Sequence, residues 1–198
     1  MKTIYNDMQS TIEELYQKYL PLKEGKLADY IPELSRANSS HFAIAIVTCE
    51  GNIYRIGDFT HNFTLQSTSK PFSYGLLLSQ IGPEAILKIV GVEPTGEAFN
   101  SIIELEKKTH RPYNPMINSG AIAVCAHLQA PTPEERFQKV LSHFEQYTNR
   151  KLDYNKEVFY SEKKTAHRNR AIGHLLRHFE IIGDDIEESL DLYFKQCS

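Results

Sequence analysis

Apolar positions recur at helical spacing along most of the chain and at strand spacing in one short stretch. An amphipathic helix is predicted over residues 7–20, whose apolar side holds Met8, Ile12, Leu15, Tyr16 and Tyr19. From residue 67 onward the pattern is mostly helical, with Thr132 and Glu135 forming a capping box. The predicted helices there are 71–81, 83–90, 98–108, 118–128, 132–147, 171–180 and 184–198.

A single hairpin is predicted, from strands at residues 41–49 and 53–58 joined by the turn "EGN". Residues 42–47 are apolar at every position, which is typical of a strand buried on both faces inside a sheet. Such a strand needs a neighbour on each side, and a lone hairpin is marginal in water. The pattern therefore predicts an α+β fold with a helical region and an incomplete antiparallel sheet. Its missing strands are expected from a further C-terminal segment or from a partner chain.

Composition and charge exclude several classes of partner. Apolar residues make up 41% of the 198 residues, and the net charge of −3 predicts no general attraction to nucleic acid or anionic membrane. The basic cluster Lys163, Lys164, Arg168 and Arg170 has acidic and apolar neighbours, so we interpret it as a solvated helix face rather than a phosphate-binding patch.

Cysteine usage and hydropathy indicate a cytoplasmic protein. The cysteines Cys49, Cys125 and Cys197 are odd in number and widely spaced, which suits a reducing compartment. The first 20 residues lack the apolar core of a secretory signal. The longest apolar run, 42–47, is too short to span a membrane.

Ser67 and Lys70 are the strongest candidate for chemistry. Residues three apart on a helix share a face, so the lysine amine can lie near the serine hydroxyl. A serine is a poor nucleophile until a base takes its proton. A free lysine is neutral in only about one molecule in 2,500 at pH 7. Burial at the start of an apolar helix would lower the lysine pKa toward the useful range.

Weaker candidates leave alternatives open. Ser161 and Lys164 repeat the spacing but lie in a polar stretch that we interpret as exposed. Ser67 could also be a helix cap and Lys70 a first-turn surface residue. The polar residues before the helix at 118–128 could be helix caps or substrate contacts: Asn114, Asn118 and Ser119. The spacing of His174 and His178 is also found in zinc sites, but no third ligand accompanies them. The sequence leaves these alternatives open.

Several motifs taken together resemble one family. "LQSTSK", "NPMINSGAI", "SEKKTAHRN", "KLADYIPEL", "GVEPTGEAFNSII" and "LYFKQCS" follow one another in the order found in the serine-dependent glutaminases, from about residue 26 to 198. The resemblance implies a β-lactamase/penicillin-binding-protein-like fold and hydrolysis of L-glutamine to L-glutamate and ammonia without a cofactor or metal. It also implies one glutaminase domain over 1–198, with an N-terminal helix and hairpin (1–60) and a mainly helical part (61–198), in a homo-oligomer.

The resemblance assigns roles to individual residues. Ser67 resembles the nucleophile, Lys70 its base, and Tyr193 an active-site tyrosine that assists proton transfer. Glu162 resembles the carboxylate that meets the α-ammonium group of the substrate. The remaining expected substrate contacts are Tyr30, Gln66, Asn118 and Asn169, and Ser67 and Tyr193 are expected to contact the substrate as well.

The resemblance also implies that family members are longer than this sequence at the C-terminal end. Family members continue past this point with further strands, a second tyrosine and a backbone donor of the oxyanion hole. We therefore expect the 198 residues alone to have little glutaminase activity. Two alternatives are another acyl-serine hydrolase, such as a β-lactamase, and a non-catalytic domain that binds an amino acid.

Overall fold

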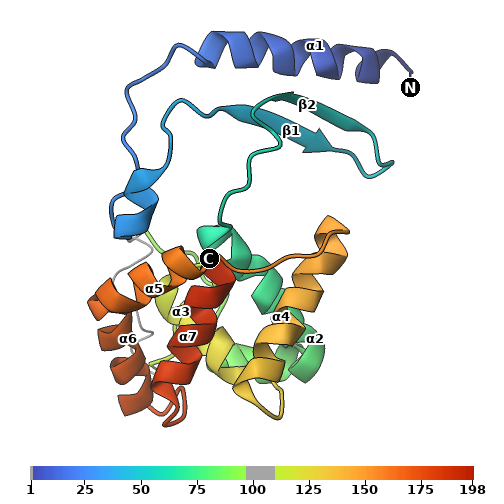
Figure 1. Ribbon diagram of the computed structural model, residues 1–198. Coiled ribbons are helices and arrows are strands. Elements are labelled where there is room, and N and C mark those ends of the chain that lie inside the picture. Colours follow the sequence, from blue (N-terminus) through green and yellow to red (C-terminus); the bar gives the residue numbers. More distant parts are fainter. Residues whose placement is uncertain (1, 97–109) are drawn as a thin grey trace. The chain divides into compact units, whose positions relative to one another are not determined.

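The computed structural model describes residues 2–96 and 110–198 and separates into two units, Met1–Phe63 and Thr64–Ser198. The first unit holds one long helix and a hairpin, and the second is helical (Figure 1). The described residues therefore form an α+β fold, as predicted. The helix predicted over 98–108 lies outside the described residues.

Helix α1 (Lys2–Tyr19) packs against the hairpin of the first unit. Ile12 of this helix is 1% exposed, and the Tyr16 ring stacks on Phe42 with 5.1 Å between ring centroids. Figure 1 shows the helix running alongside the two strands. The predicted apolar side of α1 thus supplies the contact with the sheet.

The hairpin pairs β1 (Ala43–Val47) antiparallel with β2 (Ile53–Gly57). Gly57 has a φ of +78°, in the left-handed region that favours glycine. A Cβ at this position would also collide with the Phe42 carbonyl oxygen and the Tyr16 ring. A glycine is therefore required where β2 ends beneath α1.

The apolar run 42–47, predicted to belong to an incomplete sheet, is not buried on both faces among the described residues. Ala43, Ala45 and Val47 are exposed, and only the alternate residues Ile44 and Ile46 are half-buried. The sheet has two strands among the described residues, and α1 contacts it. A two-stranded sheet with a helix on one face leaves its other face open, so a continuous apolar run shows alternating burial.

The segment predicted as a loop before the hairpin contains one short 3-10 helix, η1 (Pro32–Arg36). Pro32 occupies its first position, where the absent N–H of proline costs no hydrogen bond.

The second unit consists of a 3-10 turn and six α-helices among its described residues. They are η2 (Gln66–Ser69), α2 (Lys70–Ile89), α3 (Asn118–His127), α4 (Pro133–Thr148), α5 (Lys156–Thr165), α6 (His167–His178) and α7 (Ile186–Cys197).

Helix α3 forms the centre of the second unit. Every residue from Asn118 to Cys125 is buried, and α3 packs against α2, α6 and α7. A helix made of small and apolar residues on all sides is suited to such a position. Helix α7 also packs against α4, α5, α6 and η2.

Two local signals of the sequence are confirmed in these helices. The predicted segments 71–81 and 83–90 are two parts of α2 that meet at Gly82, whose φ is +79°, just before Pro83. The Thr132 side chain accepts a hydrogen bond from the Glu135 N–H at 3.2 Å and caps α4. Helix α6 begins earlier than predicted, at His167.

Candidate active site

Ser67 and Lys70 lie on consecutive turns of the chain, at the junction of η2 and α2. The Lys70 backbone N–H donates to the Ser67 carbonyl oxygen, which closes a 3-10 turn in which side chains three apart eclipse. Ser67 is exposed, whereas Lys70 is 2% exposed. The alternative that Lys70 is a surface residue is therefore wrong, and the residue at the cap of α2 is Ser69 rather than Ser67.

The Lys70 ammonium group is held inside the second unit by oxygen acceptors. Its Nζ atom donates to the Met116 carbonyl oxygen at 2.8 Å and to Asn118 Oδ1 at 2.9 Å. Burial lowers the pKa of Lys70, and the neighbouring Cys197, Cys125 and Glu162 oppose that shift. The lowered pKa shifts the amine in the direction of the neutral form that a general base requires.

Asn118 connects the lysine to a second asparagine. Its Oδ1 atom accepts from Lys70, and its Nδ2 atom donates to Asn169 Oδ1 at 3.1 Å. Both asparagines are buried, at the first turns of α3 and α6. The structure therefore brings together three of the predicted site residues in one hydrogen-bonded chain: Lys70, Asn118 and Asn169.

The loop before α3 is held by Asn114 and needs a glycine. Asn114 Oδ1 accepts from the Met116 N–H at 3.0 Å and from the Ile117 N–H at 3.3 Å. A Cβ on Gly120 would collide with the Asn114 carbonyl group. Asn114 and Gly120 therefore hold the loop in which the Met116 carbonyl oxygen lies beside Lys70.

Glu162 is a buried carboxylate close enough to Lys70 to affect its ionisation. It is 8% exposed, and its Oε2 atom has no hydrogen-bond partner among the described residues. Burial raises the pKa of Glu162 to about 7, against the opposing influence of Lys70. An acceptor that is buried without a partner is costly, so this oxygen is suited to receiving a donor from a ligand.

The other predicted site residues are distributed over both units. Gln66 Nε2 donates to Thr64 Oγ1 at 3.0 Å and to the Cys197 carbonyl oxygen at 3.3 Å. Tyr193 of α7 is 3% exposed. Tyr30 belongs to the first unit, where its side chain is 62% exposed.

The competing serine–lysine pair has a different environment. Ser161 is half-buried in α5, and Lys164 is exposed, so this lysine lacks the burial of Lys70. Glu162, between them, is buried because one side of α5 faces α7.

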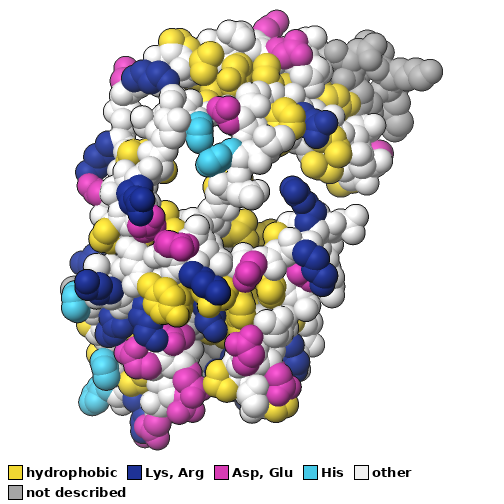
Figure 2. All heavy atoms as spheres, viewed as in Figure 1, with side chains coloured by type: hydrophobic (Ala, Val, Ile, Leu, Met, Phe, Trp, Pro, Cys, Tyr) yellow, Lys and Arg dark blue, Asp and Glu magenta, His cyan; other side chains and the backbone are white. Residues whose placement is uncertain are grey.

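Two of the four residues of the basic cluster form ion pairs with acids. Lys163 Nζ lies 2.6 Å from Asp191 Oδ2, and Arg170 Nε lies 3.1 Å from Glu187 Oε1. In Figure 2 basic and acidic side chains are interspersed over the helical unit. The interpretation as an ordinary solvated face agrees with these pairs.

Sequence reasoning overlooked a set of buried polar side chains around the turn. Ser69 and Ser73 lie on α2 or its cap, and Gln196 and Cys197 lie on α7, all at most 4% exposed. The sequence offered one signal for this set, Ser73, which lies three residues after Lys70 and so shares its helix face. Contacts between segments far apart in the sequence leave no local pattern.

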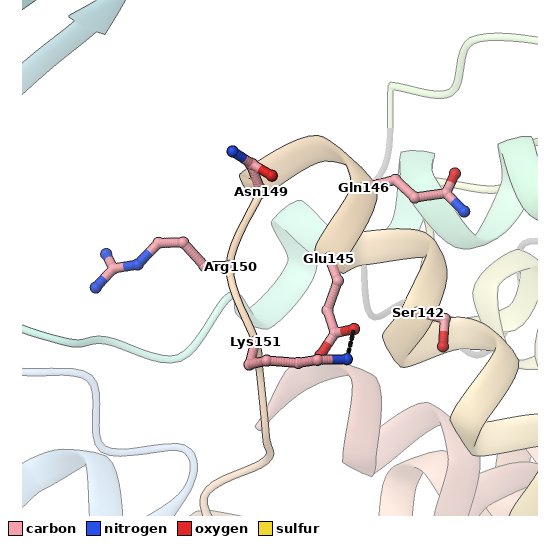
Figure 3. Close-up of a pocket in the computed structure, with 6 residues that line it drawn as sticks. All are labelled: Ser142, Glu145, Gln146, Asn149, Arg150 and Lys151. Atoms are coloured by element: carbon pink, nitrogen blue, oxygen red, sulfur yellow. Dashed lines mark hydrogen bonds and ion pairs between the residues drawn. The ribbon is translucent and has the colours of Figure 1, made fainter.

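A surface hollow lies at the end of α4 (Figure 3), lined by Ser142, Glu145, Gln146, Asn149, Arg150 and Lys151. Glu145 Oε2 lies 3.1 Å from Lys151 Nζ, and its Oε1 accepts from the Leu152 N–H at 3.0 Å. Hydrogen bonding to Leu152 and Lys151 lowers the pKa of Glu145. These contacts stabilise the turn after α4.

Residues 2–96 and 110–198 hold no cluster of metal ligands. Nowhere in that part of the chain do three or more His, Cys, Asp or Glu side chains gather in a way that could bind a metal ion. His174 and His178 are exposed. None of the helices in the same residues has the length and apolar character needed to cross a membrane.

Curated relatives share much of this sequence. A sequence model of the family described as Glutaminase matches residues 25–198. The glutaminase of Trichormus variabilis is 49% identical over 189 residues, and that of Microcystis aeruginosa is 47% identical over 197 residues. These matches cover 96% and 100% of this chain but 56% and 58% of the relatives, so the chain spans a little over half of their length.

Solved structures agree with the sequence relatives. A structure described as a probable glutaminase superposes with a TM-score of 0.92 at 38% identity, covering 98% of this chain and 62% of that one. The crystal structure of Mglu in its glutamate form gives a TM-score of 0.87 at 36% identity, covering 93% of this chain and 42% of that one. With this backbone arrangement and the match over residues 25–198, the chain belongs to the glutaminase family.

Proposed function

We propose that this chain carries the acyl-serine chemistry of an L-glutamine amidohydrolase, with Ser67 as the nucleophile and Lys70 as its base. The Ser67 oxygen attacks the side-chain amide carbon of glutamine, the carbon–nitrogen bond breaks, and ammonia leaves. Water then cleaves the glutamyl ester to release L-glutamate. The burial of Lys70, one 3-10 turn after an exposed serine, is the observation that carries this proposal.

Proton transfer is assigned to Lys70. In its neutral form the amine takes the proton of the Ser67 hydroxyl and returns it to the departing nitrogen, and Tyr193 assists this transfer. The acceptors at Met116 and Asn118 hold the amine in place, while burial lowers its pKa. No cofactor is needed, because each step uses only side chains and water.

Substrate recognition is assigned to the polar groups around the lysine. Glu162 would receive the α-ammonium group, which would satisfy its unpartnered Oε2 atom. Asn169 would meet the α-carboxylate, and Gln66, Asn118 and Tyr30 would complete the contacts. The related protein Mglu has been crystallised in a glutamate form, which supports a ligand of this chemistry.

Covalent labelling tests the nucleophile. A glutamine-like diazoketone is expected to modify Ser67, and L-glutamine should protect it. Ser67→Ala should abolish the modification, whereas Ser161→Ala should leave it intact because Lys164 is exposed. Mass spectrometry of the peptides that contain residues 67 and 161 provides the measurement.

The same measurement separates the alternatives. Modification of Ser67 by a penicillin, and not by the diazoketone, would favour another acyl-serine hydrolase. Glutamine binding that persists in Ser67→Ala by calorimetry, with no labelling and no ammonia release from the unmutated chain, would favour an amino-acid-binding domain.

Domain extent, compartment and assembly are proposed on separate observations. Both units would belong to one glutaminase domain, because the family match begins at residue 25, inside the first unit. A cytoplasmic location is supported by the free thiols Cys49, Cys125 and Cys197. A homo-oligomer is supported by the apolar residues exposed on the hairpin.

A further inference from the structure

The last turn of α7 contacts the turn that carries Ser67 at two points and the start of α2 at a third. Gln66 Nε2 donates to the Cys197 carbonyl oxygen at 3.3 Å, and Ser69 Oγ lies 3.8 Å from Cys197 Sγ. One turn further along α2, the Ser73 hydroxyl donates to Gln196 Oε1. These contacts join residues that are more than 120 positions apart in the sequence.

Four of the five residues that make these contacts are buried, and the fifth, Gln66, is half-buried. Ser69 is 0% exposed and Ser73 is 1% exposed, while Gln196 and Cys197 are 4% and 3% exposed. A buried polar group that loses its partner is not rescued by solvent. The Cys197 carbonyl also belongs to the end of α7, where helix carbonyls lack partners within the helix, so the Gln66 amide satisfies a group that needs a donor.

The turn itself holds a backbone conformation that needs support. Gln66 has a φ of +50°, in the left-handed region that a non-glycine residue rarely adopts. Such a conformation persists only where the surroundings enforce it. The Gln66 side chain spans Thr64 and Cys197, which fixes the residue immediately before Ser67.

We propose that the last turn of α7, through Gln196 and Cys197, positions the Ser67 turn against the Lys70 amine. Gln196 and Cys197 are positioning residues that act through Gln66, Ser69 and Ser73. The Cys197 thiol stays protonated at neutral pH, because burial and the nearby Glu162 raise its pKa to about 12. It therefore serves as a neutral contact. The expected effect on Ser67 reactivity rests on the proposed function. The expected effect on the stability of the turn does not.

The test compares two buried cysteines of the same core. Cys197→Ala removes the contact with Ser69, whereas Cys125→Ala removes a thiol that is 0% exposed in α3 and that makes no hydrogen bond to Ser69 or Ser73 in the described chain. Hydrogen exchange is measured at the Thr68 and Lys70 amides, which close the turn onto Leu65 and Ser67. Exchange at both amides is expected to rise about tenfold in Cys197→Ala and to stay unchanged in Cys125→Ala.

A second readout is the pH dependence of diazoketone labelling at Ser67. Misplacing the hydroxyl should lower the labelling rate about tenfold or more without moving the midpoint to higher pH, because Met116 and Asn118 still enclose Lys70. Loss of Cys197, which opposes the lowering of the Lys70 pKa, can only move the midpoint to lower pH. General loosening of the core would instead admit water to Lys70 and move the midpoint to higher pH. Ser73→Ala, which deletes one oxygen, should act in the same direction and decides the matter if Cys197→Ala does not fold.

The outcomes separate the two proposals. Equal effects of Cys197→Ala and Cys125→Ala on exchange and labelling would overturn the positioning role. An unmutated chain that is not labelled would contradict the proposed function, and hydrogen exchange alone would then support or overturn the role of α7.

Discussion

Lys70 and Glu162 are two ionisable residues that the fold encloses close to each other. Lys70 is 2% exposed and Glu162 is 8% exposed. Burial lowers the pKa of Lys70 and raises the pKa of Glu162, so it stabilises the neutral form of each group. Their mutual attraction opposes both shifts. The protonation of each group therefore depends on the charge of the other.

Glu162 makes the stability of the chain depend on pH. Its pKa is raised to about 7 from an ordinary value of 4.5, so the folded chain holds more protons than the unfolded chain between these values. Stability is therefore lost as pH rises through this window, by up to about 3 kcal/mol at full ionisation. Glu162→Gln is expected to be more stable than the unmutated chain at pH 8 and to lose that advantage at pH 4.

Thermal unfolding followed by circular dichroism at several pH values measures this difference. Glu157→Gln, on the exposed side of the same helix, is the matched control and should show no gain that grows with pH. A Glu162→Gln advantage that is the same at pH 4 and pH 8 would contradict the assigned pKa shift.

At the scale of elements, helix ends and breaks follow local chemistry. Helix α4 begins with Thr132 accepting the Glu135 N–H and ends with Asn149 in the left-handed conformation. Helix α2 bends where Gly82 takes a φ of +79° before Pro83. These devices act within a few residues, so they stabilise an element without deciding where it packs.

Removal of the α4 cap should reduce stability by a modest, defined amount. Thr132→Ala leaves the Glu135 N–H without its side-chain acceptor, which costs about 1 kcal/mol and about 2–4 °C in melting temperature. Thr132→Ser keeps the acceptor and should restore most of the loss. A melting temperature of Thr132→Ala within 0.5 °C (roughly a tenth of a kcal/mol) of the unmutated chain would argue against the cap as a source of stability.

At the scale of the whole molecule, the two units differ in how much apolar surface they bury. Among the residues of Met1–Phe63 whose burial is described, the fully buried apolar side chains are Ile12 and Ile31, whereas the described part of Thr64–Ser198 has a continuous core around α3 and α7. On the hairpin Val47 is 67% exposed and Ile53 is 61% exposed, and these two residues are directly paired across the strands. An apolar pair in this position is suited to contact with a second copy.

Self-association through the hairpin is open to direct measurement. Sedimentation equilibrium should detect a dimer or larger assembly, and Val47→Lys should weaken it at least about tenfold by placing a charge in the contact. Leu22→Lys is the control, because Leu22 is 56% exposed in the same unit but lies outside the hairpin. A monomer at all concentrations, or equal weakening by both variants, would refute the hairpin as the contact.

The sequence by itself determined the elements and the chemistry of single positions. Helical periodicity, the Thr132 cap, the break before Pro83 and the hairpin could be predicted because each depends on neighbours within a few residues. The motifs around Ser67, Asn118 and Glu162 identified the family, because residues at short, fixed spacings can be read from the sequence without knowledge of the fold.

Only the tertiary structure decided which of these residues meet and which are buried. Among the described residues the hairpin is covered by α1 on one face, since burial depends on what packs against a strand and not on the strand alone. Glu162 is enclosed within a polar stretch because α5 lies against α7. The bonds from Lys70 to Met116 and Asn118, and from Gln66 to Cys197, join segments far apart in the sequence, and their geometry exists only once the helices have packed.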